Sequence, residues 1–227
     1  MGEIVEFPSN GSTAQGYLAT PESGTGPGVV VIQEWWGLVE HIKDVADRLA
    51  GEGFVALVPD LYHGEAASTK EPDEAGKLMM SLNLEQAAKD MSGAVDYVAT
   101  HSNGKVGVIG FCMGGALALL LGTLRPDVIK AVVPFYGVIG WPATEPDWSK
   151  MTAAVQGHYA ENDDMAGPAA VEKLEKELGS RGVDVELFLY PGTTHAFFND
   201  TRPEVHDPEA SALAWQRSVD FLRAHLS

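Results

Sequence analysis

The chain has 227 residues and is strongly acidic, with 15 Lys and Arg against 32 Asp and Glu and a net charge of −17. Such a negative field repels phosphate backbones and anionic lipid surfaces, which argues against binding to nucleic acids or membranes. The length suits one α/β domain over residues 1–227, and we expect a monomer. A single Cys, no basic leader pattern and no long apolar run predict a cytoplasmic protein.

The start of the chain predicts two edge strands followed by buried ones. Strand-like stretches at 3–7 and 15–19 flank Asn10-Gly11, a dipeptide typical of tight turns, so we expect an antiparallel hairpin at the sheet edge. Apolar, β-branched runs at 29–32 and 54–58 are typical of strands buried on both faces, and residues 41–51 between them have helical spacing. Residues 62–83 are polar and weakly periodic, and we expect a long excursion that could cover a site.

The rest of the chain alternates between helix and strand. We expect helices after Cys112 and over 84–100, 168–178 and 208–225, and strands over 105–110, 130–134, 152–156 and 183–190. Residues 138–151 look irregular and carry Trp141 and Trp148. This alternation predicts an α/β fold, a mainly parallel sheet with helices on both faces and functional groups at the carboxyl ends of its strands.

A glycine-flanked cysteine interrupts the transition from strand to helix near the middle of the chain. Gly110, Cys112 and Gly114 form the pattern Gly-x-Cys-x-Gly, the spacing of a nucleophile elbow with cysteine in place of serine. An elbow would expose the sulfur at a helix N-terminus, where negative charge is favoured. The alternative is a lone buried cysteine on an ordinary turn.

Ionisable side chains follow several predicted strands: Glu34, Cys112, His195, and an acid that is Asp163 or one of its rivals Glu161 and Asp164. The chain order of Cys, acid and His matches that of α/β-hydrolases. In this interpretation His195 accepts the thiol proton, the acid fixes the imidazole, and Cys112 attacks a carbonyl to form a thioester that water hydrolyses. Alternatively, His195 is a solvated loop residue and Asp163 caps the next helix.

An oxyanion hole would complete such a site. We expect one backbone N–H from Met113, directly after the nucleophile, and a second from Trp35 in the loop after the 29–32 strand. Paired aromatic residues beside a site usually form its wall. The residues expected to contact a substrate are Trp36, Tyr136, Asn199 and Arg202.

Several motifs together resemble the dienelactone hydrolase (carboxymethylenebutenolidase) family. They are Gln33-Glu-Trp-Trp-Gly37, Gly110-Phe-Cys-Met-Gly-Gly115, Ala160-Glu-Asn-Asp163 and Tyr190-Pro-Gly-x-x-His195-x-Phe. The resemblance implies an α/β-hydrolase fold without a large cap domain, a Cys112–His195–Asp163 triad, and no metal or organic cofactor. It also selects Asp163 from the rival acids, and it implies that Glu34 pairs with the resting thiol and moves away when substrate arrives.

The sequence departs from the family pattern at one position. Members that act on dienelactones bind the substrate carboxylate with two arginines, one of them four residues after the catalytic His, where this chain has Asn199. Lys70, Lys77 or Arg202 could substitute, although lysine lacks the fork that fits a carboxylate. We therefore expect a hydrolase of small lactones or esters, uncharged ones included. The alternatives are a general carboxylesterase or thioesterase, and a non-catalytic ligand-binding scaffold of the same fold.

Overall fold

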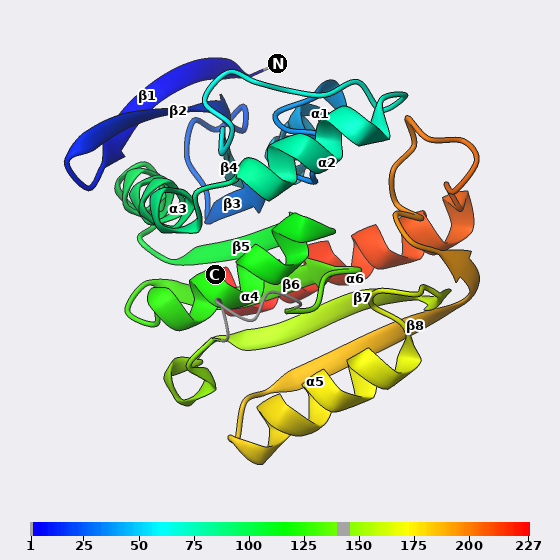
Figure 1. Cartoon of the computed structure of the whole chain (residues 1–227). Helices are drawn as coiled ribbons and strands as arrows, with labels where there is room; N and C mark the ends of the chain where they lie inside the picture. Colours follow the sequence, from blue (N-terminus) through cyan, green and yellow to red (C-terminus); the bar gives the residue numbers. More distant parts are fainter. Residues whose placement is uncertain (1, 140–145) are drawn as a thin grey trace. The chain divides into compact units, whose positions relative to one another are not determined.

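The computed structural model describes residues 2–139 and 146–227, and Figure 1 traces them from the N-terminus to the C-terminus. By their contacts the residues separate into two compact units, one ending at Val106 and the other beginning at Gly107. The expected irregular stretch at 138–151 lies partly outside the described residues, including its Trp141; Trp148 begins a short 3-10 helix, Trp148–Lys150.

The strands of the first unit begin with the expected hairpin. Strands β1 (Glu3–Ser9) and β2 (Ser12–Ala19) pair antiparallel, and the turn between them contains Asn10 and Gly11, both with positive φ. Strand β2 pairs antiparallel with β4 (Val55–Pro59), which pairs parallel with β3 (Gly28–Ile32). Every residue of β3 and β4 is buried, as their unbroken apolar sequences predict.

Two of the helices in this unit have their expected positions. Helix α1 (Glu40–Gly51) buries Ile42, Val45 and Leu49 and packs on β4. Helix α3 (Leu84–Thr100) packs on β1 and β3, and the Asn83 side chain caps it by accepting a hydrogen bond from the Gln86 N–H at 3.1 Å. Their sequences predicted them because each buries one stripe at helical spacing.

The stretch 62–83 differs from the expectation, because it contains helix α2 (Pro72–Ser81). Pro72 occupies its first turn, where the missing N–H costs nothing. Only a narrow stripe faces inward: Ala75 belongs to a small apolar cluster with Trp36 and Ala67, and Leu78 packs against it. Because so few residues of α2 face inward, its sequence shows little helical periodicity. The helix is stabilised instead by tertiary packing against the cluster that contains Trp36.

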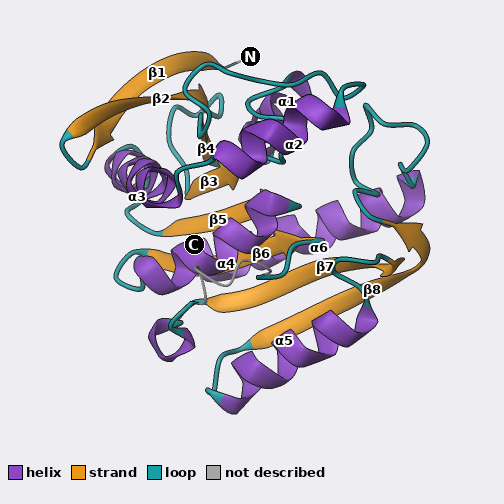
Figure 2. Cartoon of the chain, in the orientation of Figure 1, coloured by secondary structure: helices purple, strands orange, loops and turns teal. Residues whose placement is uncertain are grey.

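In the part of the second unit that the structure describes, four strands follow the order β5-β6-β7-β8. They are β5 (Val106–Phe111), β6 (Ile129–Phe135), β7 (Ala154–Asn162) and β8 (Val185–Thr194), and β6–β7 and β7–β8 pair parallel. The helices are α4 (Met113–Leu124), α5 (Pro168–Ser180) and α6 (Pro208–Leu226). Helix α6 packs on β6 and β7 from the far side in Figure 2, whereas α4 lies on β6 and α5 along β8 on the near side.

Two strands of this unit run further than the sequence predicted. The expected end of β7 was Gln156, yet residues 157–160 continue it in register with residues 187–190, and β8 continues past Pro191 to Thr194. Gly157 and His158 suggested a loop because both look out of place in a buried strand. In the structure His158 is fully buried and satisfied, since its ring nitrogens meet Tyr190 Oη at 2.8 Å and Ser218 Oγ at 3.0 Å.

Candidate active site

The turn between β5 and α4 has the conformation of an elbow. Cys112 is the N-cap of α4 and has φ 54° and ψ −118°, a region that non-glycine residues seldom occupy. A Cβ at Gly110 would collide with the carbonyl oxygen of Gly114, and one at Gly115 would lie 2.8 Å from the carbonyl oxygen of Phe135. The glycines therefore allow strand and helix to approach closely enough to hold the cysteine in this strained conformation.

Backbone hydrogen bonds fix the elbow from both sides. The Cys112 N–H donates to the Phe135 carbonyl at 3.0 Å, and the Cys112 carbonyl accepts from the Gly115 N–H at 2.9 Å. Met113 begins α4 and is buried, and the first N–H groups of a helix point out of its end. The role of the Met113 N–H in an oxyanion hole stays a prediction.

The extension of β7 and β8 brings an acid and a histidine together. Asn162 and Thr194 are partners at the end of the parallel β7–β8 pairing, and Asp163 and His195 follow them directly. The Asp163 Oδ2 lies 2.7 Å from the His195 Nδ1, and the Asp163 side chain is 0% exposed. The register of two strands thus joins residues 32 positions apart in the sequence.

The other oxygen of Asp163 is also occupied. Its Oδ1 accepts hydrogen bonds from the N–H groups of Met165 at 2.9 Å and Ala166 at 3.0 Å. These bonds close the turn that follows β7, whereas Gly167 is the N-cap of α5. The alternative in which Asp163 caps that helix does not describe the structure, because the carboxylate orients the loop and the histidine instead.

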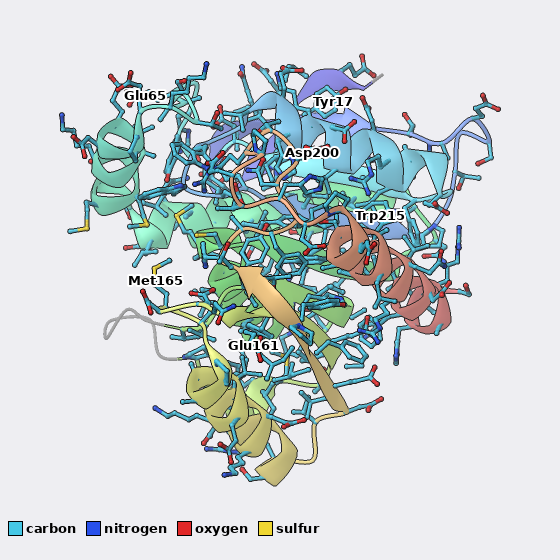
Figure 3. The ribbon with its side chains drawn as sticks, turned by 90° about the vertical axis from the view of Figure 1, so that its right-hand side faces the viewer. Tyr17, Glu65, Glu161, Met165, Asp200 and Trp215 are labelled. Carbon is cyan, nitrogen blue, oxygen red and sulfur yellow. The ribbon has the colours of Figure 1, made fainter. Side chains whose placement is uncertain are left out.

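The two rival acids have different surroundings. Glu161 lies on β7, where Figure 3 labels it, and its Oε2 accepts a hydrogen bond from the Gly192 N–H at 2.8 Å. Asp164 is exposed. Spacing in the sequence left the three acids equivalent, and the structure places only Asp163 against His195 among the described residues.

Electrostatics favour a charged imidazole at His195. Burial alone lowers the pKa of His195, but the hydrogen bond to Asp163, together with the hydrogen bond and charge of Cys112, raises it to about 10. Burial likewise raises the pKa of Asp163, yet the bond to His195 and the backbone N–H groups hold it below its ordinary value.

Cys112 and His195 are neighbours without an aligned bond. The Nε2 of His195 has no partner of regular hydrogen-bond geometry among the described residues. Since Nδ1 is bonded to Asp163, Nε2 is the nitrogen left for the sulfur. Cys112 and His195 share a neighbour, because Tyr136 packs on His195 and the next residue, Gly137, lies against the Cys112 carbonyl. Loose contacts of this kind are usual in sites without substrate. The structure therefore brings Cys112, Asp163 and His195 together within the second unit.

The segment after β6 forms one wall of this site. Tyr136 has a positive φ of 38°, is buried, and packs its ring edge-on against His195 with centroids 5.1 Å apart. A Cβ on the next residue, Gly137, would lie 2.5 Å from the Cys112 carbonyl oxygen. Tyr136, expected to contact substrate, thus lies against the histidine, and its predicted substrate contact remains a prediction.

The two substrate-contact candidates after His195 have intramolecular partners. Asn199 is fully buried, and its Oδ1 accepts from the Thr201 N–H at 3.1 Å and Oγ1 at 2.7 Å. Arg202 donates from Nε to Glu204 Oε1 at 2.9 Å. Neither contact needs a ligand, so their roles toward a substrate stay predictions.

The remaining candidates belong to the first unit, in the loop after β3. Glu34 is 1% exposed, and its carbonyl accepts from the Gly37 N–H at 3.2 Å, which orients the peptide that carries the Trp35 N–H. The Trp35 ring meets Trp36 edge-on at 5.0 Å. Tyr62 donates from its hydroxyl to the Trp35 carbonyl at 3.1 Å, a contact that the sequence did not suggest because 27 residues separate the two.

No group of three or more His, Cys, Asp or Glu residues in the described ranges could hold a metal ion. Within the same ranges, no helix is long and apolar enough to cross a membrane.

Fold and sequence agree on the class of protein. A crystal structure of a candidate dienelactone hydrolase from Klebsiella pneumoniae superposes with a TM-score of 0.88 at 28% identity over 99% of both chains, which defines an α/β-hydrolase fold. The model of the dienelactone hydrolase family matches residues 14–226. Over the full length of both chains, "Protein usf" of Aquifex pyrophilus is 40% identical and a candidate carboxymethylenebutenolidase of Aquifex aeolicus is 37% identical. The chain belongs to the dienelactone hydrolase family, and it is a hydrolase.

Proposed function

We propose that this protein hydrolyses small esters or lactones through a Cys112–His195–Asp163 triad and a thioester acyl-enzyme. The observation that carries the proposal is the hydrogen bond between the buried Asp163 and His195, beside a cysteine in elbow conformation. Strained backbone, a fixed imidazole and a carboxylate with both oxygens bonded are costly features, which a catalytic role would explain.

The first half-reaction acylates the sulfur. His195 takes the Cys112 proton on Nε2, and the sulfur attacks the substrate carbonyl carbon to give a tetrahedral oxyanion. The N–H groups of Met113 and Trp35 stabilise that oxygen. The intermediate collapses as the carbon–oxygen bond to the leaving group breaks, and His195 returns the proton to the departing alcohol oxygen. The thioester remains on Cys112.

The second half-reaction needs a neutral imidazole, and acylation itself favours one. Part of the rise in the His195 pKa comes from the charge of Cys112. A thioester carries no charge, so this contribution disappears after acylation, and the His195 pKa falls. His195 then accepts a proton from water as the oxygen attacks the thioester, and it returns this proton to the sulfur when the carboxylic acid leaves.

We further propose that the Glu34 carboxylate pairs with the Cys112 thiol in the resting enzyme and moves away when substrate arrives. The support is its family motif together with its burial directly after β3, because a buried carboxylate requires partners.

A small uncharged ester is the second candidate substrate, and Asn199 favours it. Asn199 stands where dienelactone-cleaving members have arginine, and its oxygen is already bonded to Thr201. We also propose that residues 1–227 form one functional domain and that the protein acts as a monomer in the cytoplasm.

The test is hydrolysis of 4-nitrophenyl acetate and of a dienelactone by the parent and Cys112→Ala, with mass spectrometry of the parent quenched during turnover. The expected result is a covalent acyl adduct on the parent and a loss of activity of about a thousandfold or more in the variant. Parent-like turnover by Cys112→Ala with an unchanged melting temperature would refute the triad.

A further inference from the structure

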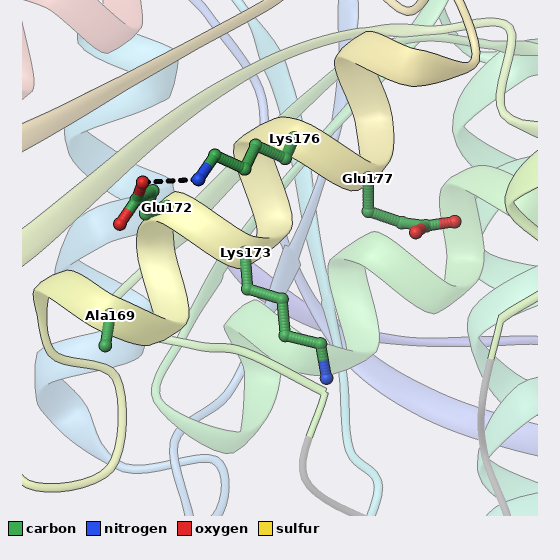
Figure 4. A pocket seen from close by; sticks show the side chains of 5 residues that line it. All are labelled: Ala169, Glu172, Lys173, Lys176 and Glu177. Carbon is green, nitrogen blue, oxygen red and sulfur yellow. Dashed lines mark hydrogen bonds and ion pairs between the residues drawn. The ribbon is translucent and has the colours of Figure 1, made fainter.

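Two polar contacts of the second unit lie in opposite surroundings. Along the pocket on α5 in Figure 4, Glu172 pairs with Lys176, and both side chains are largely exposed, so the pair contributes little. Tyr159 on β7 is completely buried, and its hydroxyl donates to the carbonyl of Gly137 at 3.1 Å, in the segment after β6. A hydrogen bond in such dry surroundings can fix the backbone that accepts it.

The sequence of β7 omits a side chain where the ring of this tyrosine lies. Gly157 is two residues earlier on the same face of the strand, and a Cβ there would lie 2.5 Å from Cε2 of the Tyr159 ring. Glycine in a buried strand is unfavourable, because it loses conformational freedom and contributes no packing. The ring therefore occupies the place of the missing side chain, and from that position its hydroxyl reaches the Gly137 carbonyl.

The segment that accepts this bond lies against two members of the candidate triad. A Cβ on Gly137 would lie 2.5 Å from the Cys112 carbonyl oxygen. The neighbouring Tyr136 packs its ring edge-on against His195, with centroids 5.1 Å apart, although its own backbone is strained at φ 38°. Strained backbone persists only where the surrounding contacts hold it, and the bond from Tyr159 is one of these contacts.

We propose that Tyr159 is a positioning residue for His195. Its hydroxyl holds the Gly137 peptide and thereby keeps the Tyr136 ring against the imidazole. This inference rests on the proposed Cys112 chemistry and adds a buried residue outside the triad to it. Burial raises the pKa of the Tyr159 hydroxyl, which therefore stays protonated and acts as a donor. A fixed ring beside the imidazole limits its rotation, so that Nε2 stays directed for proton transfer.

The test compares Tyr159→Phe with the matched control Tyr190→Phe, because each removes only a hydroxyl from a buried tyrosine. The Tyr190 hydroxyl bonds His158 Nδ1 at 2.8 Å instead of the segment after β6. Tyr159→Phe is expected to lower kcat for 4-nitrophenyl acetate about fivefold, with KM nearly unchanged, because the imidazole is less well oriented. Tyr190→Phe is expected to lower the melting temperature at least as much and to keep the parent kcat.

The pH dependence of Cys112 alkylation by iodoacetamide provides a readout that a loss of stability alone would not change. Since the thiolate is the form that reacts, the profile reports the pKa at which the pair of Cys112 and His195 forms. Tyr159→Phe is expected to shift this profile by about half a pH unit toward higher pH, because a less ordered imidazolium stabilises the thiolate less. Tyr190→Phe is expected to leave the profile in place.

Removing the ring between them tests whether Tyr159 acts through Tyr136. In a Tyr136→Leu background the hydroxyl has no ring left to position, so adding Tyr159→Phe should lower kcat further by less than about twofold. The full loss in that background, the same losses in Tyr190→Phe, or parent-like kcat and alkylation in Tyr159→Phe would each overturn the inference. Ester hydrolysis that depends on Cys112 would then still stand, whereas parent-like turnover by Cys112→Ala would refute the proposed function and the inference with it.

Discussion

Two histidines of the second unit have pKa values that are shifted in opposite directions. His158, in the middle of β7, is fully buried against the Phe135 and Phe188 rings and bonds only hydroxyl groups. Burial, helped by the charge of Arg217, lowers the pKa of His158 to about 3. His195 is only partly buried, with 23% of its side chain exposed, and its carboxylate and sulfur neighbours raise its pKa to about 10.

The comparison shows that burial by itself does not decide the direction in which the pKa of a histidine shifts. Desolvation disfavours the charged form at both positions, and the partner decides which form is present. Hydroxyl groups satisfy a neutral ring and tie β7 to β8 and α6, so His158 is structural. A carboxylate stabilises the imidazolium, so His195 can take a proton from a thiol.

The largest expected effect is that of Asp163→Asn, which makes the surroundings of His195 resemble those of His158. Without the carboxylate, burial dominates, the pKa of His195 falls, and kcat should drop about 10³- to 10⁴-fold. Ester hydrolysis and an NMR titration of the imidazole measure the two changes. Asp164→Asn, at the exposed neighbour, is the control and should keep the parent rate. Retained activity in Asp163→Asn would show that Asp163 is not the acid of the triad.

The converse substitution, His158→Leu, should affect stability without affecting chemistry. Tyr190 keeps its bond to Arg217 and Ser218 keeps its bond to the Ala214 carbonyl, so the cost is limited to about 1–3 kcal/mol of unfolding free energy. Urea unfolding and kcat below the transition provide the measurements. A kcat loss comparable with that of Asp163→Asn would contradict the structural role of His158.

The pH dependence of stability should show both histidines, with opposite signs. The raised pKa of His195 gives stability that is complete below pH 6.5 and is lost as pH rises toward about 10. The depressed pKa of His158 costs stability as pH falls from 6.5 toward about 3, because the unfolded chain binds the proton more tightly. Melting temperatures should therefore decline less on the alkaline side in His195→Gln and less on the acid side in His158→Leu. Parallel curves for all three proteins would exclude these assignments.

The smallest expected effect is that of Ser218→Ala, which removes the hydroxyl on His158 Nε2. The cost should be about 1–2 kcal/mol, since the hydroxyl's hydrogen bonds to His158 Nε2 and to the Ala214 carbonyl are both lost while the ring keeps Tyr190. Urea unfolding again measures it, with Ser211→Ala as a comparison on the same helix. An unchanged midpoint would mean that these bonds contribute nothing to folding.

Much of the molecule could be predicted from local patterns. The alternation of helix and strand gave the fold class, and the hairpin and helix α3 have the expected positions. The elbow was predictable from the Gly-x-Cys-x-Gly spacing, and in the structure a Cβ at Gly110 would collide with the carbonyl oxygen of Gly114. Helix α2 and the last residues of β7 were missed, because their stability comes from Trp36 and from β8 rather than from their own periodicity.

By itself, therefore, the sequence determined the order of the elements, the elbow and a short set of ionisable candidates, since turns, caps and periodicity act over a few residues. Spacing alone left Asp163, Glu161 and Asp164 equivalent, and it was the family resemblance that selected Asp163. The tertiary structure shows why Asp163 meets His195, because that contact depends on the register of β7 against β8. The tertiary structure also decided that the pKa of His158 is lowered and that of His195 raised, since a pKa is set by neighbours that lie far away along the chain.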